Sequence, residues 1–219
     1  MARVGLIHGL GGMAATMAPL EAALCDAGHE CVAVTLPGHG TSPDALEGVG
    51  WAEWLAAVPQ AEVLVGQSMG GVLALAAAAI RGSAVRLVVA VNAPAPDPDA
   101  LDGLEWRQSR GHHWVDGPPL ADGEEGYTRF PITALIEMVQ GGMAVDAAAV
   151  TARVVLVNSD DDDVVDPASA GVWAAALAAG ATTVEQVVLP GGSHVATMGP
   201  AASHLADIVL TALTALASP

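Results

Sequence analysis

The feature of this 219-residue chain that most constrains its fold is a serine flanked by glycines, Gly66-Gln67-Ser68-Met69-Gly70. The preceding run, EVLV at 62–65, is typical of a strand, and the following run, GVLALAAAAI at 71–80, is typical of a helix. A turn this sharp between strand and helix holds its central serine in a strained backbone conformation, and the flanking residues must be small for the two elements to approach. The pattern therefore predicts a strand–turn–helix unit that presents Ser68 as an activated nucleophile.

Short runs rich in Val, Leu and Ile recur along the chain, with stretches of helical composition between them. Because these runs show little polar alternation, they indicate strands that are buried on both faces, as in a parallel sheet. The sequence therefore predicts an α/β fold with a mostly parallel sheet of about six strands, covered by helices on both faces. The expected strands are RVGLIH at 3–8, CVAVTL at 31–36, EVLVGQ at 62–67, RLVVAVN at 86–92, RVVLVNS at 153–159 and VEQVVLP at 184–190, and the expected helices lie near 14–27, 51–58, 71–80, 167–179 and 203–217.

The length of the chain predicts a single domain that spans residues 1–219. The strand–helix alternation breaks at about 94–150, where Pro, Gly and Asp are frequent and where the only Tyr and Phe occur. Ligands of parallel sheets bind beyond the carboxyl ends of the strands, so we expect this insertion to lie there as a small cap that forms a lid or pocket wall. The alternative is an ordinary long loop with one helix near 132–140.

The charge balance restricts the partners of the protein. The formal net charge is −17, with seven arginines and no lysine. Such a chain cannot assemble the basic patch that nucleic-acid phosphates require, and an anionic membrane surface is disfavoured for the same reason. The acidity also disfavours anionic substrates mildly, which leaves a small neutral molecule as the expected partner. Nothing in the composition predicts an oligomeric state.

Two further features bear on the location of the protein. The only cysteines, Cys25 and Cys31, imply no disulfide framework and are expected to be free thiols in the core. The longest apolar run, near 69–80, is far shorter than the ~20 residues that cross a bilayer. The first 18 residues make a poor signal peptide because His8 and several glycines interrupt their apolar stretch. We therefore expect a cytoplasmic protein without a membrane span.

A serine nucleophile needs a general base, and one histidine follows the last expected strand. The segment GGSHVAT at 191–197 places His194 on a loop at the carboxyl edge of the sheet, where it can take the serine proton. The remaining histidines are expected to be structural or solvated. His8 and His39 stand beside glycines and are expected to orient loops, and the others are His29, His112, His113 and His204.

The base in turn needs a buried acceptor that holds its tautomer, and four consecutive aspartates follow the expected strand at 153–159. The usual pattern places the acid two residues before a Val-Val pair, here Val164-Val165, and this selects Asp162, with Asp163 as the main alternative. The other aspartates of this run are expected to form a solvated acidic turn. No metal is expected, because the run lacks the spaced ligands and the glycine of a calcium-binding loop.

Backbone donors for a developing oxyanion are expected at two places. The glycines of HGLGG at 8–12 follow the first expected strand and allow the N–H of Leu10 to point towards the site. Met69 opens the helix after Ser68, and its N–H has no acceptor within that helix. The alternative for HGLGG is a glycine turn that only links strand to helix.

Together, HGLGG, GHGTSP at 38–43, GQSMGG at 66–71, DDVVDP at 162–167 and SHVAT at 193–197 resemble the small bacterial carboxylesterases and monoacylglycerol lipases of the α/β-hydrolase superfamily. The resemblance runs nearly from end to end, although residues 94–127 do not match the cap of these proteins convincingly. It implies an α/β-hydrolase fold in which Ser68 is the nucleophile, His194 the base and Asp162 the orienting acid. It further implies that Leu10 and Met69 form the oxyanion hole.

This resemblance implies a cofactor-independent serine hydrolase for neutral carboxylic esters of short to medium acyl chains, with monoacylglycerols among the candidate substrates. The alternatives on the same scaffold are a thioesterase, a carbon–carbon bond hydrolase or a lyase. A non-catalytic protein that binds a small ligand is the alternative outside the enzymes. A dehalogenase is disfavoured because it would need an aspartate in place of Ser68.

Overall fold

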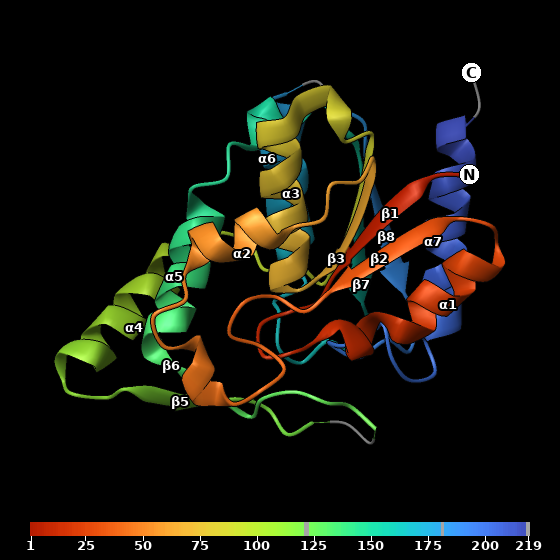
Figure 1. The fold of residues 1–219 in the computed structure, drawn as a ribbon. Helices are drawn as coiled ribbons and strands as arrows, with labels where there is room; N and C mark the ends of the chain where they lie inside the picture. Colours follow the sequence, from red (N-terminus) through yellow and green to blue (C-terminus); the bar gives the residue numbers. More distant parts are fainter. Residues whose placement is uncertain (121–122, 181, 218–219) are drawn as a thin grey trace.

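The computed structural model describes residues 1–120, 123–180 and 182–217, and within them six parallel strands form one sheet (Figure 1). The order of the strands across the sheet is β2-β1-β3-β4-β7-β8. This confirms the predicted fold class, and each expected strand is found within a residue or two of its expected bounds. The strands are β1 (Arg3–Ile7), β2 (Glu30–Val34), β3 (Val63–Gln67), β4 (Leu87–Val91), β7 (Arg153–Ser159) and β8 (Val184–Leu189).

Helices cover both faces of the sheet (Figure 1). On one face lie α1 (Ala18–Asp26) and α7 (Ala202–Ala217), and on the other lie α2 (Trp51–Ala57), α3 (Met69–Arg81) and α6 (Ser169–Ala178). Short 3₁₀ turns complete the connections, namely η1 (Ala14–Met17), η2 (Pro43–Leu46), η3 (Gly82–Ala84) and η4 (Ala147–Ala149).

Alternate residues of the central strands feed two separate cores. In β3, Leu64 packs into the core beneath α3 and α6, whereas its neighbour Val65 packs into the core beneath α1 and α7. This is the burial on both faces that the unbroken apolar runs predicted. It does not extend to the last strand, where Val188 is 66% exposed, because β8 lies at the edge of the sheet.

The strand order places a crevice at the carboxyl edge of the sheet. From β1 the chain moves to β2 on one side, and it then continues from β3 outwards on the other side. The loops that follow β1 and β3 therefore diverge, which is where open parallel sheets bind ligands. Residues 9–12 follow β1, and Ser68 follows β3, so both face this crevice.

The segment at 94–150, here called the cap segment, contains more regular structure than the sequence suggested. It holds α4 (Pro98–Ser109), the antiparallel hairpin of β5 (Trp114–Asp116) and β6 (Arg129–Pro131), and α5 (Ile132–Met143). Of these elements the sequence indicated only the last helix, and only in the alternative of a long loop with one helix near 132–140. The pair Asp97-Pro98 starts α4, because the Asp97 carboxylate accepts from Ala100 N at 3.0 Å and Pro98 occupies the first helical position.

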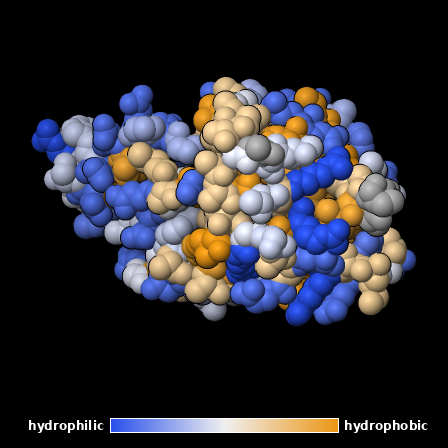
Figure 2. Space-filling model, turned by 90° about the horizontal axis from the view of Figure 1, so that it is seen from above, coloured by the Kyte–Doolittle hydropathy of each residue, from blue (hydrophilic) through white to orange (hydrophobic). Residues whose placement is uncertain are grey.

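The two helices of the cap segment differ in their attachment to the rest of the protein. No residue of α4 is buried, and the lobe in which it lies, at the left of Figure 2, carries mainly hydrophilic residues. By contrast, α5 is fixed to the first turn of α2. The Glu137 carboxylate accepts from Trp51 N at 3.0 Å, and the Trp51 ring lies directly against Gly141.

The two cysteines are both free, but only one part of the prediction about them is right. Cys25 is exposed at the end of α1 and Cys31 is half-buried, so the expected core position is wrong for Cys25. Burial, together with a hydrogen bond to the Cys25 thiol, raises the pKa of the Cys31 thiol to about 12. Because a thiolate is the reactive form, Cys31 is not suited to act as a nucleophile.

The helices of the described ranges include no candidate for a membrane span. None of the helices there combines the length and the apolar character that a bilayer requires.

Two adjacent glycines of α5 give a test of its packing. A Cβ at position 141 would lie 2.0 Å from the Trp51 ring, whereas a Cβ at position 142 would lie 3.6 Å from Val72, an ordinary contact. We expect Gly141→Ala to lower the free energy of unfolding by about 1–3 kcal/mol through overpacking. Gly142→Ala should raise it by about 0.5–1 kcal/mol, because alanine favours the helix. Urea unfolding at equilibrium measures both changes, and equal effects of the two substitutions would contradict the packing described.

Candidate active site

The turn between β3 and α3 holds Ser68 in a strained conformation. Its φ of 53° and ψ of −123° lie outside the regions that L-residues favour. A Cβ at Gly66 would lie 2.0 Å from the carbonyl oxygen of Gly70, and a Cβ at Gly70 would lie 2.2 Å from that of Ile7. The glycines are therefore required by contact between strand and helix, as the sequence predicted.

His194 and Asp162 meet on the loops that follow β8 and β7. The Nδ1 atom of His194 lies 3.0 Å from Oδ1 and 3.1 Å from Oδ2 of Asp162, whose side chain is only 6% exposed. Since an ionised carboxylate can only accept, Nδ1 carries the proton and Nε2 is left as the basic nitrogen. Of the two aspartates left open by the sequence, Asp162 contacts the ring, while Asp163 lies on the wall of the adjacent cavity.

The surroundings of Asp162 favour its ionised form. Burial by itself would raise the pKa of this carboxyl group. The hydrogen bond from His194 and those from the N–H groups of Val165 (3.0 Å) and Val164 (2.9 Å) outweigh burial and hold the pKa below its usual range. The carboxylate therefore stays charged against the histidine ring.

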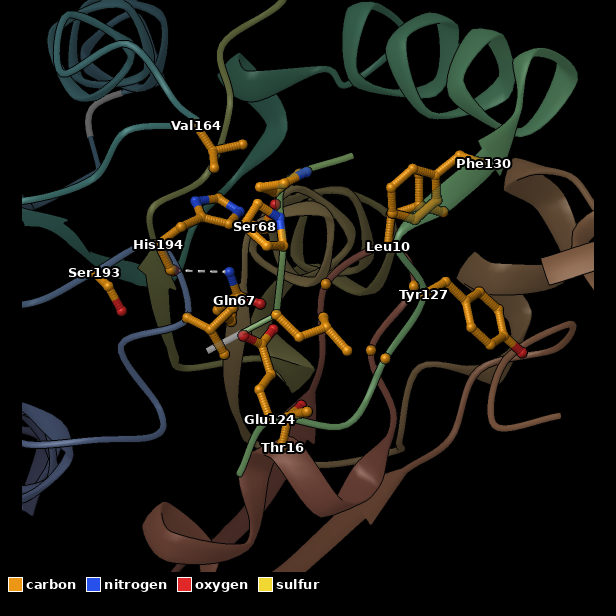
Figure 3. A pocket seen from close by; sticks show the side chains of 18 of the residues that line it. Leu10, Thr16, Gln67, Ser68, Glu124, Tyr127, Phe130, Val164, Ser193 and His194 are labelled. Atoms are coloured by element: carbon orange, nitrogen blue, oxygen red, sulfur yellow. Dashed lines mark hydrogen bonds between the residues drawn. The ribbon is translucent and has the colours of Figure 1, made fainter. Parts of the chain in front are cut away.

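Ser68 and His194 line the same cavity (Figure 3). Within the described residues their side chains form no hydrogen bond with each other. Hydrogen bonds between catalytic groups often form only once substrate is bound, so this spacing is compatible with proton transfer in a complex. The structure thus brings the serine, histidine and aspartate candidates to one place.

The loop after β1 lies directly against the serine. Gly9 has no room for a side chain, because its Cβ would lie 2.6 Å from Oε1 of Gln67 and 3.0 Å from Cβ of Ser68. Gly12 N donates to Gly9 O at 3.1 Å and closes the turn. In the described chain the N–H of Leu10 has no backbone acceptor, and that of Met69 belongs to the first turn of α3. Whether these two N–H groups bind an oxyanion therefore stays a prediction.

Tyr127 of the cap segment holds this loop by hydrogen bonds. Its N–H donates to Gly11 O at 2.9 Å, and its hydroxyl donates to Gly38 O at 3.2 Å and accepts from Thr41 N at 3.0 Å. The ring of Phe130 closes over Gly11, where a Cβ would lie 2.5 Å from the ring. The sequence singled out Tyr127 only as the one tyrosine of the chain, and nothing in it indicated these contacts.

His8 and His39 support the same loops as neutral rings. His8 Nε2 accepts from Leu36 N at 3.0 Å, so Nδ1, 2.7 Å from Gly9 O, carries the proton. Burial lowers the pKa of His8 to about 4 and also lowers that of His39, whose ring stacks on Tyr127. Their contacts agree with the expected role of orienting loops. The other histidines lie away from the cavity, with His112, His113 and His204 exposed and His29 accepting from Ala2 N at 3.3 Å.

The cavity beside Ser68 has a volume of about 440 Å³, within the range of ~300–1,000 Å³ that small-molecule sites occupy. Residues of the cap segment form much of its wall. Among the residues that the structure describes, the charged side chains that line it are those of Glu124 and Asp163, and none is an arginine. The apolar lining residues include Leu10, Leu120, Phe130, Leu135, Met138, Val164 and Val195.

Two polar residues at the site were not predicted from the sequence. Asn92, directly after β4, and Gln67, directly before the serine, both donate from their side chains to the carbonyl oxygen of His194. Each looked like the end of a strand, and no local pattern distinguished either from a solvated polar residue. For metals, the described ranges contain no cluster of three or more His, Cys, Asp or Glu side chains able to hold an ion.

Comparison with known proteins identifies relatives of this chain. A model described as the alpha/beta hydrolase family matches residues 6–204. The thermostable monoacylglycerol lipase of Bacillus sp. (strain H-257) is 29% identical over 213 residues, which cover 88% of this chain and 82% of that lipase.

Solved structures show the same fold. One described under the metagenome-derived lipolytic enzymes LipS and LipT has a TM-score of 0.84 at 23% identity, and covers 95% of this chain and 91% of its own. The monoacylglycerol lipase of Paleococcus ferrophilus has a TM-score of 0.72 at 17% identity, with 98% of this chain and 95% of its own covered.

Because burial lowers the pKa of His8, we predict that the protein loses stability in mild acid. Above about pH 6.5 its ring is neutral in both the folded and the unfolded chain, so it adds no pH dependence. As the pH falls from there towards the folded pKa of about 4, only the unfolded chain takes up the proton. This should remove about 3 kcal/mol of the free energy of unfolding.

Urea unfolding at pH 7 and at pH 4.5 measures this loss. In His8→Gln, whose amide oxygen can still accept from Leu36 N, the difference between the two pH values should shrink. His204→Gln, at an exposed histidine, is the control and should behave as the wild type does. An unchanged pH dependence in His8→Gln would refute the assignment.

Proposed function

The chain belongs to the alpha/beta hydrolase family, and on that premise we propose that it is a serine hydrolase of neutral carboxylic esters with short to medium acyl chains. The observation that carries this proposal is the contact of the Asp162 carboxylate with His194, beside a cavity that the strained Ser68 also lines. An aspartate and a histidine placed in this way can activate a serine, which is a weak nucleophile by itself.

In the proposed mechanism, Ser68 Oγ attacks the ester carbonyl carbon while His194 Nε2 takes its proton. Asp162 holds the ring and stabilises the positive charge that it acquires. The N–H groups of Leu10 and Met69 donate to the oxyanion of the tetrahedral intermediate. Collapse of the intermediate transfers the proton to the departing alcohol and leaves Ser68 acylated. A water molecule, deprotonated by His194, then releases the carboxylic acid.

The lining of the cavity supports the choice of substrate. Its apolar wall favours an acyl chain, which gains free energy when it leaves water. Glu124 and Asp163 disfavour a substrate that carries a carboxylate or phosphate of its own. The distant relationship to a monoacylglycerol lipase makes monoacylglycerols the first natural substrates to test.

A direct test measures hydrolysis of p-nitrophenyl esters of graded chain length, together with covalent labelling by a fluorophosphonate followed by intact mass. We expect turnover of the butyrate ester and addition of one label. Both should be lost in Ser68→Ala. A purified, folded protein that neither hydrolyses these esters nor takes the label would refute the proposal. A marked preference for a thioester such as butyryl-CoA would replace it with thioester hydrolysis.

The role of the acid is tested by two isosteric substitutions. Asp162→Asn keeps the shape of the side chain but removes the charge that fixes the His194 tautomer, so kcat should fall by about three to four orders of magnitude. Asp163→Asn alters the cavity wall without touching His194, so kcat for the butyrate ester should stay within a few-fold of wild type. Steady-state kinetics at pH 8 separates the two, and the opposite result would assign the acid to Asp163.

A further inference from the structure

The residue after β4, Asn92, has an unusual backbone and is completely buried. Its φ is 49°, and Ser68 is the only other described non-glycine residue with a positive φ. Among residues with a Cβ, asparagine tolerates this region best, together with aspartate. An isolated buried polar side chain is costly, so the partners of Asn92 decide what it contributes.

Every polar atom of the Asn92 side chain has a partner. Nδ2 donates towards His194 O at 2.9 Å, Ser159 Oγ at 2.9 Å and Ser193 O at 3.1 Å. Oδ1 accepts from Ser159 N at 2.8 Å. One amide thus joins the end of β7, which leads into the loop of Asp162, to the loop that carries His194.

Backbone hydrogen bonds at and before Asn92 also connect the end of β4 to β7 and to Ser68. Asn92 N donates to Val157 O at 2.8 Å in β7, and the preceding carbonyl, that of Val91, accepts from Ser68 N at 2.8 Å. The end of β4 supplies none of the proposed catalytic groups. It nevertheless makes direct hydrogen bonds to the serine and to the segments that carry the other two.

The loop between β8 and α7 is also joined to the loop after β7 ahead of the histidine, where Gly191 N donates to Asp160 Oδ1 at 2.6 Å and Asp161 N donates to Gly192 O at 3.1 Å. Residues 190–201 contain no helix or strand, so backbone hydrogen bonds of regular structure do not fix the position of His194. Gln67 Nε2 donates to the same His194 carbonyl at 3.0 Å, the dashed contact in Figure 3. Asp162 can fix the rotation of the ring, but the position of the ring depends on where this carbonyl is held.

We propose that Asn92 is a positioning residue for the proposed ester hydrolysis, which it serves by holding the backbone of His194 so that the ring faces Ser68. The inference rests on the proposed roles of Ser68 and His194. Only an amide side chain suits the position, because it combines tolerance of positive φ with donors for two carbonyls and an acceptor for Ser159 N. A shift of about 1 Å in the ring can lower the rate by about 10²-fold, so loss of the anchor should appear in the chemical step.

The test compares two substitutions at Asn92. Asn92→Asp keeps the shape and the backbone preference but replaces the donor with an oxygen that faces the carbonyls of Ser193 and His194. Asn92→Gly keeps the positive φ and removes the side chain, so it serves if the aspartate variant does not fold. Either variant, folded, should lose about 10²-fold in kcat on p-nitrophenyl butyrate, with KM within about threefold of wild type. Labelling of Ser68 by a fluorophosphonate should slow by a similar factor.

A second readout does not depend on activity. In proton NMR, the Nδ1 proton that His194 shares with Asp162 should give a low-field signal in the wild type, and this signal should broaden or vanish in the Asn92 variants. If the wild type hydrolyses no ester and takes no label, the proposed function fails, while the NMR comparison still decides whether Asn92 holds the histidine.

Leu213→Ala is the matched control, since this buried residue lies near the end of α7, away from the carboxyl edge of the sheet. It should lower the melting temperature but leave kcat and the low-field signal unchanged. Wild-type kcat together with an unchanged signal in Asn92→Asp would overturn the inference. Equal losses of kcat in Leu213→Ala and the Asn92 variants would overturn it too, because general destabilisation would then explain both.

Discussion

The close approach of a strand, a turn and a helix around Ser68 is the constraint on which the rest of the site depends. The left-handed backbone at Ser68 persists because neighbouring strands hold it on both sides. Gly70 packs against the carbonyl of Ile7 in β1, and Ser68 N donates to Val91 O at the end of β4. Strain of this kind requires a surrounding structure that leaves no alternative, and the central strands of the sheet provide it. The sheet therefore acts as the rigid frame on which irregular loops can carry reactive groups.

Those loops are held mainly by buried polar side chains. His8 joins the Gly9 turn to the segment that follows β2, Asn92 joins the ends of β4 and β7 to the loop of His194, and Gln67 adds a second bond to that loop. Tyr127 does the same for the cap segment. Because a buried polar atom without a partner is costly, each of these bonds favours one arrangement of the loops over the alternatives. The geometry of the site thus follows from a hydrogen-bond network that surrounds it.

The parts that the sequence predicted are those with a local cause. Unbroken apolar runs indicated the strands, glycines marked the turn at Ser68, and the position of His194 after the last strand pointed to the site. The parts it missed depend on residues far apart in the chain. Asn92 contacts His194 across 102 positions, and Tyr127 contacts Gly38 across 89, with no local pattern to mark either. The omission of α4 has a different origin, since the frequent Pro, Gly and Asp of the cap segment gave no sign of a helix there, although Asp97 and Pro98 start one well.

The absence of any buried residue in α4 has an evolutionary consequence. Substitutions at the exposed positions of this helix remove no core contact, so they change the stability of the fold little. In α5, by contrast, contacts with Trp51 restrict what can be replaced. A lineage of such proteins can therefore vary the exposed positions of α4 with little cost to folding. New surface contacts can therefore arise at α4 without any change in the residues around Ser68.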